Sequence, residues 1–321
     1  MKEVIIGAND AGQRLDRFLK KYLCNAPLSA VYKVIRKDLK LNGKRAKEDS
    51  NLSEGDVLTF YLADADLDAW TEKKERRHKA KRQFTVCYED DDMIVVSKPF
   101  GLLVHGDKTE KKDTLANQVV DYLIETGAYN PRLEKSFVPS PVHRLDRNTT
   151  GLVVFGKSAE GLRTLSAKFR EEKSESIRKF YYTIVHGRLN EPLHLKGRLL
   201  KDEERNKARV LSEDDERGKY IETKVSPIYS TDEYSLVEIE LITGRSHQIR
   251  AHLSSIHHPL VGDTKYGGKE VSSIYDEWSL GRTTQALHAG RIIIDEKEIT
   301  APLPIAWISM QEELFKKVIL Q

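Results

Sequence analysis

The sequence predicts an α+β protein with a mixed, mostly antiparallel sheet, divided into a small N-terminal unit and a larger C-terminal unit. After residue 84, strand patterns outnumber helix patterns and do not alternate with them regularly, which argues against a doubly wound parallel fold. A length of 321 residues suits two domains. We therefore expect a small domain at 1–62, a charged flexible linker at 63–83 and a main domain at 84–321.

The N-terminal unit combines helix patterns with short strands and carries most of the positive charge. Apolar residues recur at helical spacing over 15–23, Asn42-Gly43 is a hairpin signal, and 57–62 has the composition of a strand. Residues 1–62 hold 12 Lys or Arg against 8 Asp or Glu, although the whole chain has a net charge of only +3. A basic end on a near-neutral body suggests a polyanionic partner.

The expected linker is polar, begins acidic and becomes basic. This composition is typical of a solvated tether, and its basic part would add salt-sensitive affinity for nucleic acid. In the main domain, apolar runs and alternation predict strands at 93–96, 151–155, 180–185, 237–241 and 292–294. Helical spacing predicts helices over 158–169 and 249–256.

Composition argues against several classes of protein. The two cysteines, Cys24 and Cys87, show no CxxC spacing, so we expect neither a disulfide framework nor a zinc site. No apolar run reaches the roughly 20 residues that a membrane helix needs. The N-terminal residues lack the pattern of a signal peptide. We therefore expect a cytoplasmic protein with no membrane partner.

The most informative segment is HRLDRNTTGL, residues 143–152, which places Asp146 between Arg144 and Arg147. A carboxylate kept ionised by nearby positive charge can serve as a nucleophile or a base. The two arginines can grip phosphates or stack on a displaced base. By itself, the segment is more typical of solvated surface charge or a local ion pair.

A second segment, residues 241–252, runs from a strand through a glycine turn into a helix. The junction places Arg245 near the free N–H groups of a helix N-terminus, where it can hold a phosphate or Asp146. His247 and His252 are five residues apart, which does not stack two metal ligands on one helical face. We therefore expect no metal site and interpret these histidines as structural.

A third segment, residues 179–187, is a strand in which alternation directs Tyr181 to the face opposite Phe180 and Tyr182. Such a tyrosine is either part of the core or a platform that stacks on a base. Two shorter pieces follow, the glycine-bounded loop 262–268 and the Leu-His-Ala segment that begins at Leu287.

Five motifs follow one another along the chain: HRLDRNTTGL, KFYYTIVHG, TGRSHQIRAH, GDTKYGG and LHA. Together they resemble the RluA-type pseudouridine synthases, and the N-terminal unit resembles the small alpha-L RNA-binding module that precedes many of them. The resemblance implies a catalytic domain with a central cleft at 84–321. It also implies an isomerase that converts uridine in RNA to pseudouridine with no cofactor and no metal.

The resemblance also implies roles for single residues. Asp146 matches the catalytic nucleophile, Tyr181 matches the residue that packs on the uracil and serves as base at ring carbon 5, and Arg245 matches the arginine that pairs with the aspartate. Arg144 matches the residue linked to flipping the uridine, and Leu287 lines the pocket. We expect further RNA contacts from basic and histidine side chains beside the motifs and on the N-terminal unit: Arg147, His247, Arg17, Lys33, Arg36 and Lys44.

The layout resembles the RluC and RluD subgroup, which implies large-subunit (23S) ribosomal RNA as substrate; we expect a monomer. The sequence leaves open whether Asp146 attacks the sugar, adds to the ring or removes a sugar proton. One alternative is a non-catalytic RNA-binding or ribosome-assembly factor, favoured by the basic N-terminal end. Another is an aspartate-nucleophile phosphatase, which needs further carboxylates for Mg²⁺, whereas residues 140–157 offer Asp146 alone.

Overall fold

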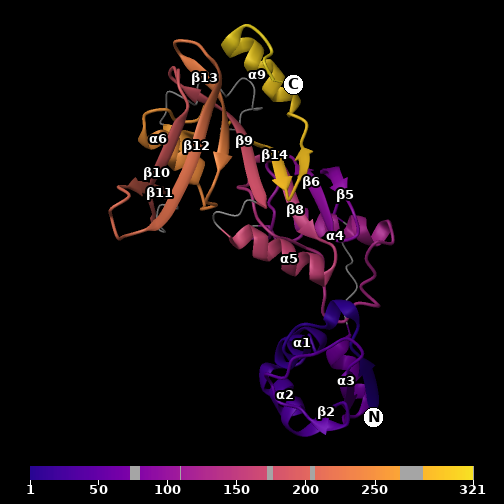
Figure 1. The fold of residues 1–321 in the computed structure, drawn as a ribbon. Coiled ribbons are helices and arrows are strands. Elements are labelled where there is room, and N and C mark those ends of the chain that lie inside the picture. The colour runs from indigo at the N-terminus through magenta and orange to yellow at the C-terminus, as the bar shows by residue number, and fades with distance from the viewer. Residues whose placement is uncertain (73–79, 109, 172–175, 203–206, 268–284, 321) are drawn as a thin grey trace.

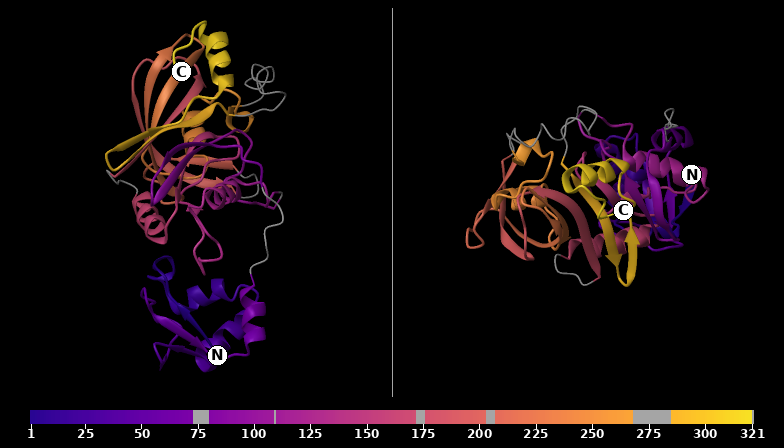
Figure 2. Two further views of the ribbon diagram at one scale, coloured as in Figure 1. Left: turned by 90° about the vertical axis from the view of Figure 1, so that its right-hand side faces the viewer. Right: turned by 90° about the horizontal axis from the view of Figure 1, so that it is seen from above.

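The computed structural model describes residues 1–72, 80–108, 110–171, 176–202, 207–267 and 285–320. A small N-terminal unit lies at one end of a much larger sheet-containing unit, and the C-terminal helix lies at the opposite end (Figures 1 and 2). The larger unit contains both helices and a mostly antiparallel sheet, so the expected fold class is confirmed. None of the helices in these ranges is long and apolar enough to cross a membrane.

The N-terminal unit is a four-stranded antiparallel sheet packed against helices. The sheet has the order β1 (Lys2–Ile5), β4 (Val57–Phe60), β2 (Leu39–Leu41), β3 (Lys44–Arg45). The helical elements are η1 (Ala8–Asp10), α1 (Leu15–Tyr22), α2 (Leu28–Lys33), η2 (Val34–Asp38) and α3 (Asp64–Thr71). Asn42 and Gly43 both have positive φ, at 50° and 75°, as the expected hairpin turn requires.

The prediction of a flexible linker is wrong over the first half of 63–83, because residues 64–71 form α3. Leu67 of this helix is buried in the core of the N-terminal unit, and Asp68 accepts a hydrogen bond from Lys2 at 2.8 Å. The acidic residues in the first turn suit the positive end of the helix dipole, so the acidic start marks a helix N-terminus. Residues 73–79 of the expected linker lie outside the described ranges.

The larger unit is built on an 11-stranded sheet whose main path runs β11, β10, β12, β13, β9, β14, β8, β6, β5, with β15 paired to β14 and β7 paired to β8. The strands are β5 (Thr85–Glu89), β6 (Met93–Lys98), β7 (Ser140–Pro141), β8 (Thr150–Gly156), β9 (Ile177–His186), β10 (Leu193–Asp202), β11 (Lys207–Leu211), β12 (Lys219–Ser230), β13 (Tyr234–Leu241), β14 (Leu287–Ile294) and β15 (Lys297–Thr300). The helices are α4 (Leu115–Glu125), α5 (Ala159–Arg170), α6 (Gln248–Ser255), α7 (Thr264–Gly267) and α9 (Ile305–Phe315).

One parallel pair, β8 with β14, joins two of the sequence motifs. His288 pairs with Thr150, and Ala289 pairs with Gly151. Gly151 has a φ of +104°, and a Cβ atom at this position would lie 2.2 Å from the backbone oxygen of Ala289. Only glycine permits this approach, so the glycine of the first motif places the Asp146 loop beside the LHA segment.

Strand β9 shows the alternation that the sequence predicts. Tyr181 belongs to the main hydrophobic core, whereas Phe180 lies on the other face between two guanidinium groups. The guanidinium carbons of Arg178 and Arg291 are 4.9 Å and 3.7 Å from the Phe180 ring centre. The strand therefore presents one aromatic face to the interior and a cation-covered face to the outside.

The two units meet through a short polar interface. Asp10, which is 2% exposed, accepts hydrogen bonds from the Ser136 backbone N–H at 2.9 Å and from the Ser136 hydroxyl at 2.7 Å. The side-chain oxygen of Asn9 accepts from the N–H of Ala159, the first residue of α5, at 2.9 Å. The N-terminal unit thus supplies a capping oxygen to a helix of the larger unit.

Candidate active site

The loop that carries Asp146 is held by a buried lysine. Lys98 at the end of β6 is 1% exposed, and its Nζ donates hydrogen bonds to the backbone oxygens of Pro99, Leu102 and Arg147 at 2.8–2.9 Å. Burial lowers the pKa of Lys98 to about 7, and the negative charge of Asp146 opposes that shift. Three carbonyl acceptors match the three donors of an ammonium group, so the loop is tied to the sheet.

The two threonines of the first motif also anchor the loop. The Thr149 backbone N–H donates to the backbone oxygen of Asp146 at 3.1 Å, and its hydroxyl accepts from Gln285 at 3.2 Å. The Thr150 hydroxyl lies 2.8 Å from Nδ1 of His288. Both threonine side chains therefore fix the backbone beside Asp146.

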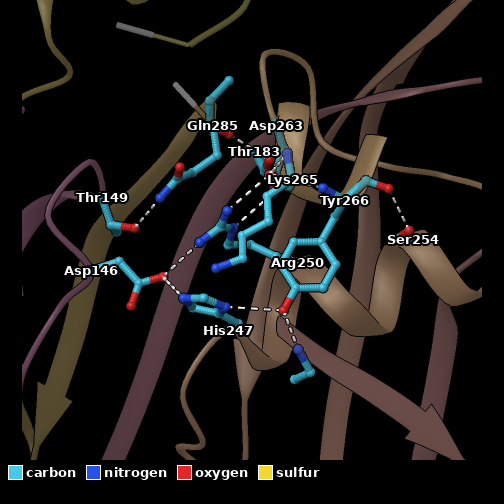
Figure 3. A network of polar contacts seen from close by, with 12 residues as sticks. Asp146, Thr149, Thr183, His247, Arg250, Ser254, Asp263, Lys265, Tyr266 and Gln285 are labelled. Atoms are coloured by element: carbon cyan, nitrogen blue, oxygen red, sulfur yellow. Dashed lines mark hydrogen bonds and ion pairs between the residues drawn. The ribbon is translucent and has the colours of Figure 1, made fainter. Parts of the chain in front are cut away.

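The Asp146 carboxylate meets two side chains of the second motif at a single oxygen. Arg250 Nη1 donates to Oδ2 at 3.1 Å, and His247 Nε2 lies 3.7 Å from the same atom (Figure 3). The Asp146 side chain is 30% exposed. The carboxylate is therefore paired with a cation while remaining open to a ligand.

Arg250 is itself held by a second, fully buried carboxylate. Its Nε and Nη2 donate to Asp263 at 2.7 Å and 2.9 Å, and Asp263 is 1% exposed. Burial opposes the charge on Arg250, but the hydrogen bond and negative charge of Asp263 raise the pKa of Arg250 overall. The bidentate contact fixes the guanidinium plane and directs its remaining donor at Asp146.

The expectation that Arg245 pairs with Asp146 is wrong, because Arg250 makes that ion pair. Arg245 lies in the turn before α6, where its backbone N–H donates to the Gln248 side chain at 3.1 Å, and its side chain lines the pocket. Arg250 lies in the first turn of α6, directly after the N-cap residue His247, and both side chains point toward Asp146 (Figure 3).

His247 connects Asp146 to Tyr266 of the GDTKYGG motif. Nδ1 of His247 lies 3.0 Å from the Tyr266 hydroxyl, and that hydroxyl accepts a hydrogen bond from the Ala208 N–H at 2.7 Å. Burial lowers the pKa of His247, and the Asp146 carboxylate opposes the shift. The Tyr266 ring also lies 5.0 Å from the guanidinium carbon of Arg250.

Asp146 opens into a pocket of about 310 Å³. The pocket is formed by the first motif, the β9 strand, the turn before α6 and the start of β14. Its lining residues include Arg144, Asp146, Lys179, Tyr181, Gly244, Arg245, Ser246, His247, Arg250 and Leu287. Elements that are far apart in the sequence therefore converge on one cavity, which matches the expected cleft.

Tyr181 and Leu287 form an apolar part of the pocket wall. They are 7% and 5% exposed, and both belong to the main hydrophobic core. Burial, with a smaller contribution from the charge of Asp146, raises the pKa of Tyr181. The phenol is therefore neutral near pH 7 and presents a ring face and a hydroxyl to a ligand.

The remaining expected contacts divide between the pocket and the surface. Arg144 is exposed and lines the pocket, whereas Arg147 is exposed, beside the loop, and does not line it. The four basic residues expected to bind RNA on the N-terminal unit are all exposed: Arg17, Lys33, Arg36 and Lys44. Their contact with RNA stays a prediction.

Sequence reasoning missed Lys98, Arg250, Asp263 and Tyr266. Lys98 could have been found from its position, because it ends an apolar run directly before Pro99. For Arg250, the available signal was its place in the second segment, residues 241–252. Nothing in the sequence linked Asp263 to either motif, because that contact depends on the fold.

Comparisons with known proteins identify the family of the chain. The sequence pattern of a family described as RNA pseudouridylate synthase matches residues 92–255. The chain is 33% identical over 319 residues to "Ribosomal large subunit pseudouridine synthase C" of Vibrio vulnificus (strain CMCP6), covering 98% of this chain and 95% of that protein. The chain belongs to the RNA pseudouridylate synthase family. Its members are RNA-modifying isomerases, which confirms the expected class of enzyme and the RluA-type resemblance.

Further relatives support the same assignment. The Escherichia coli (strain K12) protein of the same name is 31% identical over 299 residues, covering 91% of this chain and 88% of that protein. Among solved structures, "Human RNA Pseudouridylate Synthase Domain Containing 4" aligns with a TM-score of 0.56 and 22% identity, over 72% of this chain and 92% of that chain. The structural match shows that the pseudouridylate synthase fold is shared.

Proposed function

We propose that this pseudouridine synthase isomerises uridines in large-subunit (23S) ribosomal RNA, with Asp146 as the catalytic carboxylate. The observation that carries the proposal is the Asp146–Arg250 ion pair, at 3.1 Å, inside a pocket walled by Tyr181 and Leu287. The choice of RNA follows from the relatives, whose names assign them to the ribosomal large subunit.

The reaction breaks the bond between the sugar and N1 of uracil, turns the base and joins the sugar to C5. The C5 proton is lost and N1 gains a proton, so the overall change is an isomerisation that needs no oxidant or imported group. Attack on the sugar, addition to the ring and removal of a sugar proton all begin from an ionised carboxylate. Arg250 would hold that carboxylate in place through the ion pair and hydrogen bond at Oδ2.

The pocket also suits the problem of retaining a detached base. A volume of about 310 Å³ accepts a single nucleotide but no duplex, so the uridine must leave the RNA stack, at a cost of a few kcal/mol. Arg144 at the pocket is placed to fill or grip the vacated position. Tyr181 and Leu287 would hold the uracil while it turns, with Tyr181 assigned as the group near C5.

Affinity for a long RNA would come from cations around the pocket and from the N-terminal unit. The pocket lining includes Lys179 and Arg245, and the N-terminal unit presents Arg17, Lys33, Arg36 and Lys44 to solvent. Phosphate contacts of this kind position an RNA without reading its sequence. We assign the same role to Arg147.

We further propose that the protein acts as a monomer in the cytoplasm. The relatives are named for ribosomal RNA modification, and ribosomes are cytoplasmic in bacteria. Large exposed apolar side chains in the described part of the chain come from separate segments of the sequence, for example Ile5, Leu133 and Ile305. Light scattering of the purified protein tests the monomer, and a dimer mass at micromolar concentration would contradict it.

The central test compares the wild type with D146N on 23S RNA from a strain lacking the gene, with pseudouridine mapped by mass spectrometry. We expect D146N to form no product while its RNA affinity stays within about twofold, because the amide is isosteric and only the charge is lost. D232N changes an aspartate that is 88% exposed, and it should keep full activity. Turnover by D146N would refute the catalytic assignment.

The same experiment separates the proposal from its alternative. A wild-type protein that binds RNA but forms no pseudouridine in any cellular RNA would be the non-catalytic binding factor. Product in transfer RNA alone would contradict the choice of substrate and leave the chemistry intact. Full activity in excess EDTA is expected, since no step of the proposed reaction uses a metal.

A further inference from the structure

The two oxygens of Asp146 have different surroundings. Oδ2 receives both Arg250 and His247, whereas Oδ1 has no hydrogen-bond or ion-pair partner among the described residues (Figure 3). The bidentate contact with Asp263 explains how the guanidinium of Arg250 is held in place. The Arg250–Asp146 ion pair does not explain why the His247 ring also faces Oδ2, with Nε2 at 3.7 Å.

The hydrogen-bond pattern around Tyr266 determines the tautomer of His247. The Tyr266 hydroxyl accepts from the Ala208 N–H at 2.7 Å and is 3.0 Å from His247 Nδ1. Burial raises the pKa of Tyr266, so the hydroxyl keeps its proton near pH 7. Within the described residues, Nδ1 of His247 is the acceptor available for that proton, and buried hydroxyls donate to an acceptor. Neutral His247 then carries its proton on Nε2, facing Asp146.

The backbone at His247 also indicates that this placement is imposed by the fold. His247 has a φ of 60° and a ψ of 14°, the left-handed region, which is unfavourable for a residue with a side chain. Strained residues of this kind concentrate at functional sites. This backbone conformation lies where α6 begins, and the imidazole faces Asp146 (Figure 3).

We propose that His247 is a positioning residue for the pseudouridine synthase reaction, which Tyr266 holds in the Nε2–H tautomer so that His247 and Arg250 together fix Oδ2 of Asp146. Oδ1 is thereby assigned as the oxygen that reacts with the uridine. The inference rests on the proposed role of Asp146. The present 3.7 Å separation is longer than a hydrogen bond, and we expect it to shorten when substrate binds.

The charged groups around His247 predict how the rate of the reaction depends on pH. Asp146 on the preceding loop and Asp263 before α7 favour a second proton, while Arg250 on α6 and Lys265 on α7 oppose it. That proton would add a donor at Nδ1, where Tyr266 already donates, and a second full charge beside Oδ2. We therefore expect protonation of His247 to slow the reaction on the acid side.

The test uses three variants and a matched control. H247F removes both ring nitrogens, H247Q keeps an N–H donor that does not titrate, and Y266F removes the hydroxyl but keeps the ring over Arg250. H257F is the control, because His257 is exposed, outside the pocket and also left-handed, with a φ of 64°. Each variant is assayed for kcat, KM and thermal midpoint on the same RNA.

We expect H247F to lower kcat by up to roughly 100-fold, the effect of misplacing a reacting group by about 1 Å, with KM within threefold. H247Q should keep most of kcat, and the acid limb of its pH profile should lie at lower pH than in the wild type. Y266F should lower kcat by about 10-fold, and H257F should match the wild type. An H247F enzyme with wild-type kcat and pH profile would overturn the inference.

A second measurement reads the tautomer without an activity assay. Nitrogen-15 chemical shifts of the His247 ring should show the Nε2–H form in the wild type and a mixture of both tautomers in Y266F. An Nδ1–H form in the wild type would overturn the proposal even if H247F is impaired. If the wild type makes no pseudouridine at all, the proposed function fails, while the tautomer measurement still stands as a separate result.

Discussion

Arg250 lies between two carboxylates whose surroundings differ. The Asp263 side chain is 1% exposed and takes two of the guanidinium donors, whereas the Asp146 side chain is 30% exposed and takes one. Asp263 neutralises the buried cation, so Arg250 is retained in the interior without requiring Asp146 to be buried as well. At the residue scale, this difference leaves Asp146 oriented by Arg250 and accessible to a ligand.

Asp263 is therefore expected to support the reaction without touching the substrate. In D263N the amide accepts poorly from Arg250 and leaves a buried charge uncompensated, so the free energy of unfolding should fall by about 3–5 kcal/mol. We expect kcat to fall by roughly 10- to 100-fold because Arg250 loses its fixed plane. Urea unfolding and steady-state kinetics measure both effects.

The matched control for this prediction is D295N. Asp295 also pairs with a cation, Lys168, but its side chain is 57% exposed, so its removal should change stability by less than about 1 kcal/mol. If D263N were as stable and active as D295N, the guanidinium would not depend on Asp263 for its position.

At the scale of elements, the site depends on how closely β8 approaches β14. The parallel contact at Gly151 and Ala289 brings the end of the Asp146 loop against the strand that carries Leu287. Thr150 and His288 hold the same junction with a side-chain contact of 2.8 Å. The loop is thus positioned by a strand from the last part of the chain.

G151A should disturb this junction strongly. The added Cβ would lie 2.2 Å from the Ala289 oxygen, and the φ of +104° is one that side chains rarely adopt. We expect a loss of more than about 3 kcal/mol in the free energy of unfolding, or insoluble protein. In G7A, where no atom lies within 4 Å of the new Cβ, the thermal midpoint should stay within a few degrees.

An unchanged thermal midpoint in G151A would show that the two strands can separate without cost. In that case the glycine of the first motif would not explain the placement of Asp146.

At the scale of the whole molecule, the two units are joined by polar contacts around η1. Besides the Asp10–Ser136 and Asn9–Ala159 hydrogen bonds, Arg163 of α5 donates to the backbone oxygen of Ala11 at 3.1 Å. The interface is small and almost entirely polar, so water can replace its hydrogen bonds at moderate cost. The contacts fix one orientation of the basic N-terminal unit relative to the catalytic pocket.

Removal of the Asp10 side chain should loosen that orientation. In D10A the Ser136 N–H and hydroxyl lose their acceptor, so we expect a larger radius of gyration by small-angle X-ray scattering and a several-fold weaker affinity for long RNA. Turnover of a short stem-loop should stay within twofold, because the pocket is untouched. D64N, at an aspartate that is 71% exposed on the same unit, should change none of these values.

Stability should also fall in acid because several histidines, among them His252 and His288, are buried in the neutral form. Burial lowers the pKa of His252 and of His288 to about 4, against about 6.5 in the unfolded chain. The unfolded state binds more protons between these values, so this stability is present above pH 6.5 and is lost as the pH falls through 4. At pH 5, each histidine should have lost about 2 kcal/mol of its contribution.

The measurement is the change in unfolding free energy between pH 7 and pH 5, from urea titrations. In H252Q that change should be about 2 kcal/mol smaller than in the wild type. Equal pH dependence in the wild type and H252Q would contradict the assignment of a neutral, buried His252.

The sequence by itself determined the features that depend on residues close together in the chain. Period-2 and helical patterns placed β9, β13, α5 and α6, and the order of five short motifs was enough to indicate the family and Asp146. These features are local, because side-chain alternation and helix capping depend on neighbours a few residues away.

Only the tertiary structure decided which groups surround Asp146. Arg250 is 104 residues from Asp146, and its other partner, Asp263, belongs to a motif whose sequence alone is weak. Whether Arg245 or Arg250 reaches the carboxylate depends on the start and direction of α6, and the attachment of the N-terminal unit depends on Asp10 meeting Ser136. Such contacts are set by packing between distant segments, which no local pattern encodes.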